Sequence, residues 1–286
     1  MSYCGFSDES SHNVGRFRGV AIVTMRASVA QKYTDELQEL LGSSDVREFK
    51  WVRLQSARER FAALKMLQFT VREASSGGLR VDVLTWDTED GRHRVRRRDD
   101  GANLGRMYFH LLRKTLPRWP AGSWAVWPDE HSGMDWLSLR GYLDGKGTRT
   151  LVESSLFSRL VLRLERYYQL RSIQPCRSSE TPLVQLADLF VGLGVFSRTR
   201  AREFGAWRHN NPEAPRLFDD AVPLEVSRAD RERFQVMQEL EKACKASRLG
   251  VSLKTHGAFR IPNPSRPINF WWYEPQHQRD KAPVKL

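Results

Sequence analysis

The stretch TPLVQLADLFVGLG, residues 181–194, contains most of the longest apolar run in the sequence, and it decides how the neighbouring segments must pack. Thr181 and Pro182 are typical of the N-cap and the first position of a helix. The apolar residues that follow predict a helix from Leu183 to about Arg202. Because this helix is apolar on most of its surface, we expect it to be buried among other elements.

A polar seam runs along the same helix. Gln185, Asp188 and Gly192 share one stripe at three- and four-residue spacing. A buried carboxylate is costly unless a partner compensates it, so Asp188 either binds a cation, caps a neighbouring backbone or pairs with an arginine. Gly192 and Gly194 each cost about 1 kcal/mol relative to alanine inside a helix, which predicts close approach to a sheet.

Strands and helices alternate on both sides of this segment. Strands are predicted up to Asp8 and at Phe17–Met25, Leu79–Trp86, Ser123–Pro128 and Tyr168–Pro175, with a short extended piece at Val46–Trp51. Helices are predicted at Ala30–Leu41, Ser56–Ala74, Asn103–Leu116, Trp136–Leu143, Ser155–Arg166 and Arg228–Ser247. This alternation after an initial hairpin predicts an α/β fold, a mixed sheet with helices on both faces.

The pattern changes near Phe204, where loops punctuated by proline begin. We therefore predict a domain at 1–204 and a C-terminal extension at 205–286, with one charged helix and an aromatic, proline-rich tail packed on the domain. No apolar run approaches the roughly 20 residues that span a bilayer, and no basic-then-apolar leader is visible. The three scattered cysteines favour reduced thiols, so the sequence predicts a soluble, cytoplasmic protein with no membrane partner.

The charge balance favours a polyanionic partner. Lysine and arginine number 46 against 34 aspartates and glutamates, a net charge of +12. Such an excess attracts phosphates by releasing their counterions, so nucleic acid is the first candidate, either DNA or RNA. A basic surface that is merely solvated is the alternative.

Four acidic residues stand at unusual positions. Asp8 ends the first strand, Glu48 lies in VREFKW, Asp129 ends the strand SWAVWP, and Asp188 lies in the apolar helix. Mg²⁺ and Mn²⁺ prefer oxygen ligands, and a two-metal phosphoryl-transfer site needs several carboxylates on rigid elements. Without a metal ion, clustered carboxylates would repel one another. Convergence of these acids would therefore indicate a Mg or Mn site.

The chain resembles an uncharacterised bacterial family, domain of unknown function 3800, in four motifs. These are FSDESS at 6–11, EFKW at 48–51, VWPDEH at 126–131 and SSETPLVQLADLFVG at 178–192. The family is similar to the ribonuclease H-like superfamily, and the resemblance covers residues 3–204. It implies a ribonuclease H-like mixed sheet and a site that holds metal through carboxylates.

Position by position, the resemblance marks Asp8, Glu48, Asp129 and Asp188 as the metal ligands. Beside them it places Glu9, Lys50 and Gln185. The chain departs from the family at Ser11, where glycine is common, which affects the geometry of that turn. Many ribonuclease H-like enzymes instead place an acid where this chain has Asp87, so Asp87 is the reserve for Asp129.

Several further residues have two interpretations each. Lys50 either holds a scissile phosphate and neutralises the acids, or forms a plain salt bridge with Glu48. His131 either moves protons in catalysis or is a surface-loop histidine, whereas His110 is expected in the core. Glu9 is expected to point away from Asp8, because adjacent strand residues point to opposite faces.

Two segments could contact nucleic acid. The loop GRHRVRRRDDG carries Arg92, Arg94, Arg96, Arg97 and Arg98, which either track a phosphate backbone or pair with the following aspartates. The aromatic cluster Phe270–Tyr273 either stacks on unpaired bases or clamps the tail onto the domain or a dimer partner.

These features predict a Mg- or Mn-dependent phosphodiester hydrolase, a nuclease. Asp8, Glu48, Asp129 and Asp188 would bind two ions, and Lys50 and His131 would take part in catalysis. A non-catalytic protein that binds nucleic acid or another partner with the same fold is the alternative, as is a toxin or phage-defence effector. A homodimer remains open, as do DNA against RNA and endonuclease against exonuclease.

Overall fold

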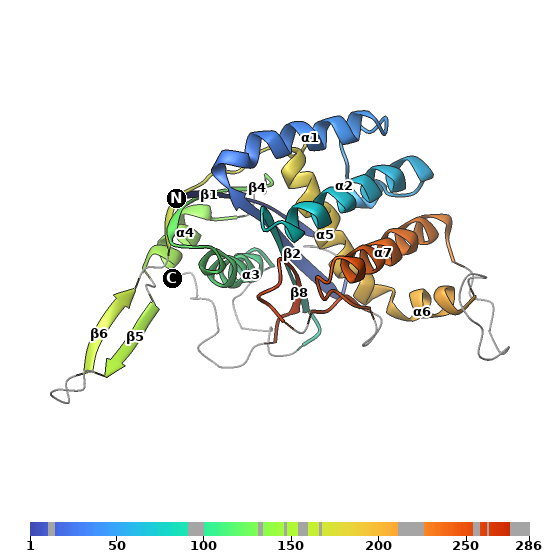
Figure 1. The fold of residues 1–286 in the computed structure, drawn as a ribbon. Coiled ribbons are helices and arrows are strands. Elements are labelled where there is room, and N and C mark those ends of the chain that lie inside the picture. Colours follow the sequence, from blue (N-terminus) through green and yellow to red (C-terminus); the bar gives the residue numbers. More distant parts are fainter. Residues whose placement is uncertain are drawn as a thin grey trace.

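A computed structural model describes ten stretches of the chain, shown as coloured ribbon in Figure 1. They are residues 1–10, 15–90, 100–130, 134–145, 148–153, 160–165, 168–210, 226–253, 258–261 and 263–274. His131 and the five arginines of the 91–101 loop lie outside these stretches. The interpretations of those residues therefore stay predictions.

The centre of the fold is a six-stranded mixed sheet in the order β7-β4-β1-β2-β3-β8. The strands are β1 (Ser2–Ser10), β2 (Phe17–Arg26), β3 (Leu79–Asp87), β4 (Gly122–Pro128), β7 (Tyr168–Ile173) and β8 (Ile268–Trp272). β2 pairs antiparallel with both β1 and β3, while β4 is parallel to β1 and β7, and β8 is parallel to β3. The predicted mixed sheet is confirmed.

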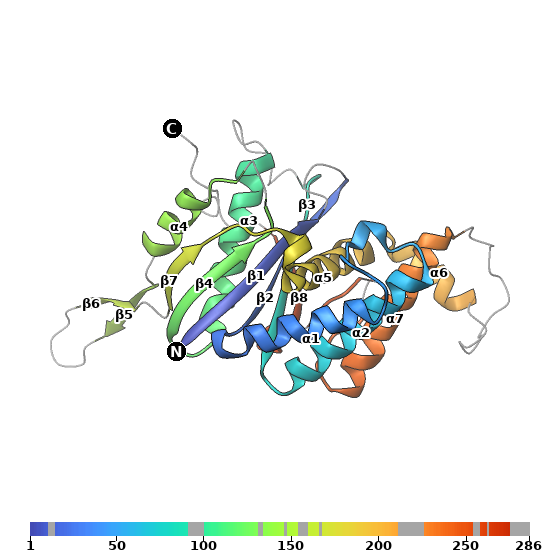
Figure 2. The same cartoon turned by 90° about the horizontal axis from the view of Figure 1, so that it is seen from above.

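Helices cover both faces of this sheet, as the sequence predicts (Figures 1 and 2). One face carries α1 (Ala30–Gly42), α2 (Ala57–Ser75), α5 (Pro182–Thr199) and α7 (Arg228–Ala246). The other carries α3 (Asp100–Thr115) and α4 (Trp136–Gly145). Side chains alternate between the two faces along each strand, so Phe6 packs in the α5 core and Tyr3 in the α3 core.

Helix α5 is buried almost throughout, and its glycines explain how closely it packs. A Cβ atom at Gly194 would lie 2.8 Å from Cγ1 of Val83 in β3, so the predicted close approach to the sheet is confirmed there. A Cβ atom at Gly192 would instead clash with the ring of Trp51, which lies outside the sheet. Thr181 is the N-cap and Pro182 the first helical residue, although the Thr181 side chain makes no capping hydrogen bond.

One predicted helix is wrong within the described residues. Leu160–Glu165, part of the segment predicted as the helix Ser155–Arg166, is the strand β6, which pairs antiparallel with β5 (Thr148–Glu153); this pair of strands projects from the body (Figure 1). The sequence LVLRLE places leucine at every second position, which suits a strand. Val46–Trp51, predicted as a short extended piece, pairs with no strand in the described part of the chain; it bends at Arg47 and Glu48, is extended at Lys50 and then enters a short 3₁₀ helix, Trp51–Arg53.

The C-terminal part of the chain is built into the same sheet. α6 (Ala201–Asn210) crosses the predicted boundary at residue 204, and β8 pairs along β3 from Val81↔Ile268 to Thr85↔Trp272. The aromatic segment Phe270–Trp272 is thus held on the domain as part of β8, as the interpretation of a clamped tail predicts; stacking on unpaired bases stays a prediction. A domain boundary at this point stays a prediction.

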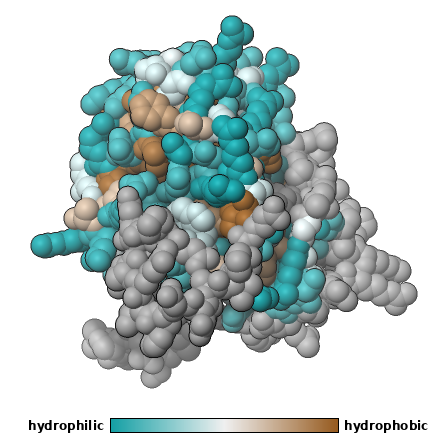
Figure 3. Space-filling model, turned by 90° about the vertical axis from the view of Figure 1, so that its right-hand side faces the viewer, coloured by the Kyte–Doolittle hydropathy of each residue, from teal (hydrophilic) through white to brown (hydrophobic). Residues whose placement is uncertain are grey.

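The sequence also made predictions about membrane-spanning segments, the surface and the cysteines. In the part of the chain that the structure describes, no helix is both long enough and apolar enough to cross a membrane. The side of the molecule seen in Figure 3 is mainly hydrophilic, with scattered apolar residues. All three cysteines are free thiols, and Cys4 and Cys244 are buried.

Candidate active site

Asp8 and Asp129 meet because their strands are parallel neighbours. Ser7 of β1 lies opposite Pro128 of β4, and the backbone N–H of Asp129 donates to the carbonyl of Ser7 at 2.8 Å. The two aspartates follow at the same edge of the sheet. Asp8 shares the face of Phe6, toward α5, and is only 5% exposed.

Asp188 and Gln185 hold the irregular segment before the 3₁₀ helix against α5. The Asp188 carboxylate accepts a hydrogen bond from the Trp51 backbone N–H at 2.7 Å. Gln185 Oε1 accepts from the Phe49 N–H at 2.8 Å, which fixes the residues on either side of Lys50. The interpretation of Asp188 as a backbone cap is therefore correct, and the polar seam places the helix against Glu48 and Lys50.

Lys50 lies among the acids. Its Nζ is 3.3 Å from Oδ2 of Asp129 and 4.0 Å from Oε1 of Glu48. Glu48 is also paired with Arg53 at 3.2 Å, near the surface. The predicted Lys50–Glu48 salt bridge is present, but the shorter contact is to Asp129, which the sequence did not indicate. We call Asp8, Glu48, Asp129 and Asp188 with Lys50 the acidic cluster.

Ser178 is a member of the site that sequence reasoning missed. Its N–H donates to Oδ1 of Asp129 at 3.1 Å, and its hydroxyl donates to Oε1 of Glu48 at 3.2 Å. Its carbonyl accepts from Nε2 of Gln185 at 2.7 Å. The available signal was its position at the start of SSETPLVQLAD, the motif that leads into α5. One serine thus joins three of the predicted residues.

The electrostatics of the acidic cluster show that its charges are not fully compensated. Burial raises the pKa of Asp8 well above its usual range, and the charges of Asp188, Glu9 and Asp129 raise it further. Burial likewise raises the pKa of Asp188 to about 6, although the Trp51 N–H and Lys50 oppose this. Burial alone would lower the pKa of Lys50, but the surrounding aspartates leave it raised. The cluster therefore favours binding of further positive charge.

The donor atoms suit Mg²⁺ or Mn²⁺, which prefer carboxylate oxygen. In the stretches that the structure describes, however, no three aspartate, glutamate, histidine or cysteine side chains already surround a single point that an ion could occupy. The acids are instead turned toward Lys50 and toward backbone N–H groups. The carboxylate oxygens are therefore suitable ligands for a divalent ion. In the present side-chain conformations, however, they bind Lys50 and backbone N–H groups instead.

Two other predicted residues lie outside the acidic cluster. Asp87, at the end of β3, pairs with Arg16 at 2.7 Å, and this hydrogen-bonded pair lowers its pKa. Glu9 points to the opposite face from Asp8, where its carboxylate accepts from the Tyr108 hydroxyl at 2.6 Å. The choice of Asp129 over Asp87 therefore agrees with the geometry, and the predicted orientation of Glu9 is confirmed.

Fold and site together define an α/β protein with an acidic cluster at one edge of a mixed sheet. No protein-family model matches the chain. It is 35% identical over 292 residues to Uncharacterized protein ORF2' and 34% identical over 295 residues to Uncharacterized protein ORF2, both from Methanothermobacter thermautotrophicus. Each alignment covers 99% of this chain and 98% of the relative. The chain belongs to the family of these two proteins.

Proposed function

We propose that the chain is a Mg- or Mn-dependent phosphodiester hydrolase with a ribonuclease H-like fold, related to domain-of-unknown-function family 3800. The observation that carries this proposal is the meeting of acids far apart in sequence, from Asp8 to Asp188, around one lysine. The basic net charge of +12 supports a polyanionic substrate. The mixed sheet with helices on both faces supports the fold assignment.

In this proposal the carboxylates of the acidic cluster turn from their present partners to hold the ions. Bound ions would supply a nucleophilic water and stabilise the leaving oxyanion. Lys50 Nζ, released from Asp129, would hold a non-bridging oxygen of the scissile phosphate. Gln185 keeps the Phe49 N–H in place and so fixes the backbone that carries Lys50. These steps use residues that the fold already brings together.

The direct test is a panel of labelled DNA, RNA and hybrid oligonucleotides incubated with Mg²⁺, Mn²⁺ or chelator. Asp8→Asn and Asp188→Asn should each lower metal-dependent cleavage at least about a hundredfold, because each removes a charged ligand. The matched control is Asp87→Asn, which removes a strand-end carboxylate that pairs with Arg16 instead. Cleavage that survives in either cluster variant, or that is lost equally in the control, would contradict the proposal.

One observation favours a second candidate, a binding protein without catalysis. The Asp188 carboxylate is engaged by the Trp51 N–H, and no three metal-ligating side chains share a point in the described part of the chain. Such a protein would bind nucleic acid in a salt-sensitive way. Calorimetry that detects no Mg²⁺ or Mn²⁺ uptake would favour this candidate over the nuclease.

A further inference from the structure

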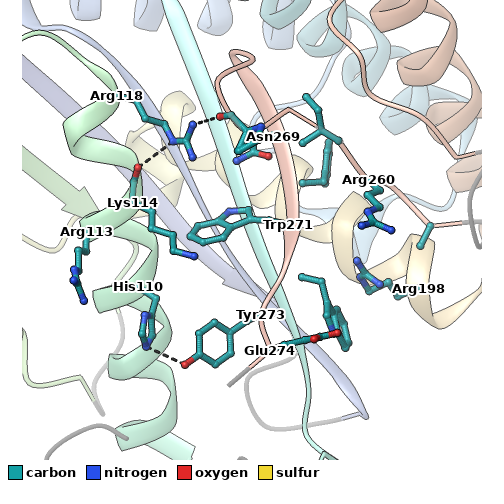
Figure 4. A pocket seen from close by; sticks show the side chains of 15 residues that line it. His110, Arg113, Lys114, Arg118, Arg198, Arg260, Asn269, Trp271, Tyr273 and Glu274 are labelled. Carbon is teal, nitrogen blue, oxygen red and sulfur yellow. Dashed lines mark hydrogen bonds between the residues drawn. The ribbon is translucent and has the colours of Figure 1, made fainter. Parts of the chain in front are cut away.

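A second feature lies around the edge strand β8. A cavity of about 900 Å³ opens there, bounded by β8, the C-terminal part of α3, the residues after it and the end of α5 (Figure 4). Trp271 of β8 and Tyr273, just after this strand, extend toward α3, while Arg198 and Arg260 lie on the other side of the strand (Figure 4). We call this cavity the basic hollow.

The charge of the basic hollow is almost entirely positive. Its cations are Arg113, Lys114, Arg118, Arg198 and Arg260, and the carboxylate among its lining residues is the exposed Glu274. In the stretches that the structure describes, none of the four arginines forms an ion pair with an acid. This contrasts with Arg16, Arg53 and Arg60 elsewhere on the molecule, each of which pairs with a carboxylate.

The guanidinium of Arg198 is largely buried, and no carboxylate in the described part of the chain balances its charge. Its Nε donates to Oγ1 of Thr85 at 2.9 Å, and its guanidinium lies 4.1 Å from the ring centroid of Trp272. Burial, together with the nearby charge of Arg260, lowers the pKa of Arg198 to about 10. A guanidinium withdrawn from water beside a second guanidinium is stabilised by an anion.

Aromatic rings and two unpaired polar atoms lie beside these cations. Lys114 Nζ lies 4.7 Å from the ring centroid of Trp271. Trp271 Nε1, a donor, and Asn269 Oδ1, an acceptor, are buried without a hydrogen-bond partner in the described part of the chain. Asn269 is only 1% exposed, and its Nδ2 is held by Asp82 at 3.0 Å. A ligand with both hydrogen-bonding edges and phosphates would satisfy this set.

We propose that the basic hollow binds single-stranded nucleic acid, with phosphates on the arginines and bases against Trp271 and Trp272, the partly exposed aromatic residues of β8. Cations on both sides of one strand suit several phosphates better than a single one. The alternation of cationic and aromatic side chains suits unpaired bases, which stack on such surfaces, whereas a duplex hides its bases. Naming nucleic acid rests on the proposed function, but the binding does not depend on the acidic cluster.

The basic hollow and the acidic cluster are close enough to share one strand. Asp8 pairs with Ala21, which pairs with Val83, which pairs with Phe270 of β8. These three strand spacings amount to about 14 Å. Along α5, the ten residues from Asp188 to Arg198 rise about 15 Å. A polynucleotide held in the hollow would therefore extend toward the acids.

The test measures fluorescence anisotropy of one labelled oligonucleotide sequence in chelator, as single-stranded DNA, single-stranded RNA and duplex. Arg198→Met with Arg260→Met should weaken single-strand binding at least about tenfold. The slope of log affinity against log salt should fall by about 1.4, because each phosphate contact on a single strand contributes about 0.7. Arg260→Met alone, at an exposed site, should give about half that change in slope and guards against misfolding of the double variant.

Arg26→Met is the matched control. Arg26 is exposed at the C-terminal end of β2 and does not line the hollow, and its substitution removes the same charge. Equal weakening by Arg26→Met, wild-type binding by the double variant, or equally tight duplex binding would overturn the proposal. If a mononucleotide at the same concentration displaces the oligonucleotide completely, the hollow binds a single nucleotide and the proposal of a polynucleotide ligand is wrong. Wild-type protein that binds the oligonucleotide in chelator but cleaves none of the oligonucleotides in Mg²⁺ or Mn²⁺ would refute the nuclease and leave the proposal for the hollow intact.

Discussion

The acidic cluster and the basic hollow are opposite in charge, and α5 contributes to both. In the cluster, four carboxylates surround Lys50, and backbone N–H groups of Trp51, Ser178, Glu9 and Glu130 each donate to an aspartate. In the hollow, the arginines converge without any carboxylate partner in the described part of the chain. The cluster is thus held in place by internal bonds, whereas the hollow leaves its charge to an outside partner.

The two regions differ in how the repulsion between their like charges is compensated. The cluster compensates part of its repulsion within the fold, so a metal ion would have to compete with Lys50 and the backbone. Arg198 and Arg260 lack a carboxylate partner in the described part of the chain, so an anion there would compete with water and, at Arg198, with the neutral contacts to Thr85 and Trp272. Variants that act on one region while sparing the other can test this contrast.

The largest effect should come from Gly192→Ala. Its Cβ would meet the Trp51 ring, and Trp51 positions Asp188, so the cluster would be forced apart. Overpacking of this kind costs about 1–3 kcal/mol, and we expect the upper end in urea unfolding. Gly205→Ala is the control, because it has open space and should be neutral or stabilising by up to about 1 kcal/mol. Oligonucleotide binding in chelator should be unchanged in folded Gly192→Ala; its loss would show that the two regions are coupled.

A smaller effect is expected from Lys50→Met. The half-buried ammonium is lost while the acids stay, so the metal-free protein should lose about 2 kcal/mol of its free energy of unfolding. Excess Mg²⁺ should restore more stability to the variant than it adds to the wild type. Lys242→Met, which removes an exposed lysine paired with Glu239 at 2.8 Å, should change stability by about 0.5 kcal/mol or less. Equal losses in the two variants would mean that Lys50 is an ordinary surface lysine.

The smallest effect is a pH dependence. The pKa of Asp188 is raised from about 3.8 to about 6, so between these values the folded state binds more protons than the unfolded state. In chelator, the wild type should therefore lose stability, relative to Asp188→Asn, as pH rises from about 4 to about 6. The expected loss is on the order of 1 kcal/mol, measured by urea unfolding at each pH. A difference that grows in the opposite direction would mean that Asp188 is favoured in its charged form.

Most of the sheet and its helices could be predicted because their periodicity is local. Phe17–Met25 is a largely apolar run rich in β-branched residues, and Ala30–Leu41 carries apolar residues at helical spacing. The hairpin of β5 and β6 was missed because LVLRLE satisfies both periods over six residues. β8 could not be placed, because its pairing with β3 depends on residues almost two hundred positions away.

The sequence predicted which residues form the candidate site, but it did not predict which of them contact one another. Asp188 stood out because a carboxylate interrupts an apolar helix, and the structure brings it to the other acids. The contact between Lys50 and Asp129 joins two loops, and no pattern within either loop encodes it. The basic hollow was missed for the same reason, since α3, α5 and β8 each contribute only part of it.

The parallel pairing of β8 with β3 also sets an order of assembly during synthesis. Every element of the acidic cluster precedes residue 200, whereas Ile268–Trp272 leaves the ribosome much later. Until then β3 is an open edge strand with exposed backbone hydrogen-bonding groups, and such edges pair readily with other chains. The nascent protein therefore passes through a stage in which every element of the acidic cluster has been synthesised while the sheet is still incomplete, and this is the stage at which chaperone protection matters.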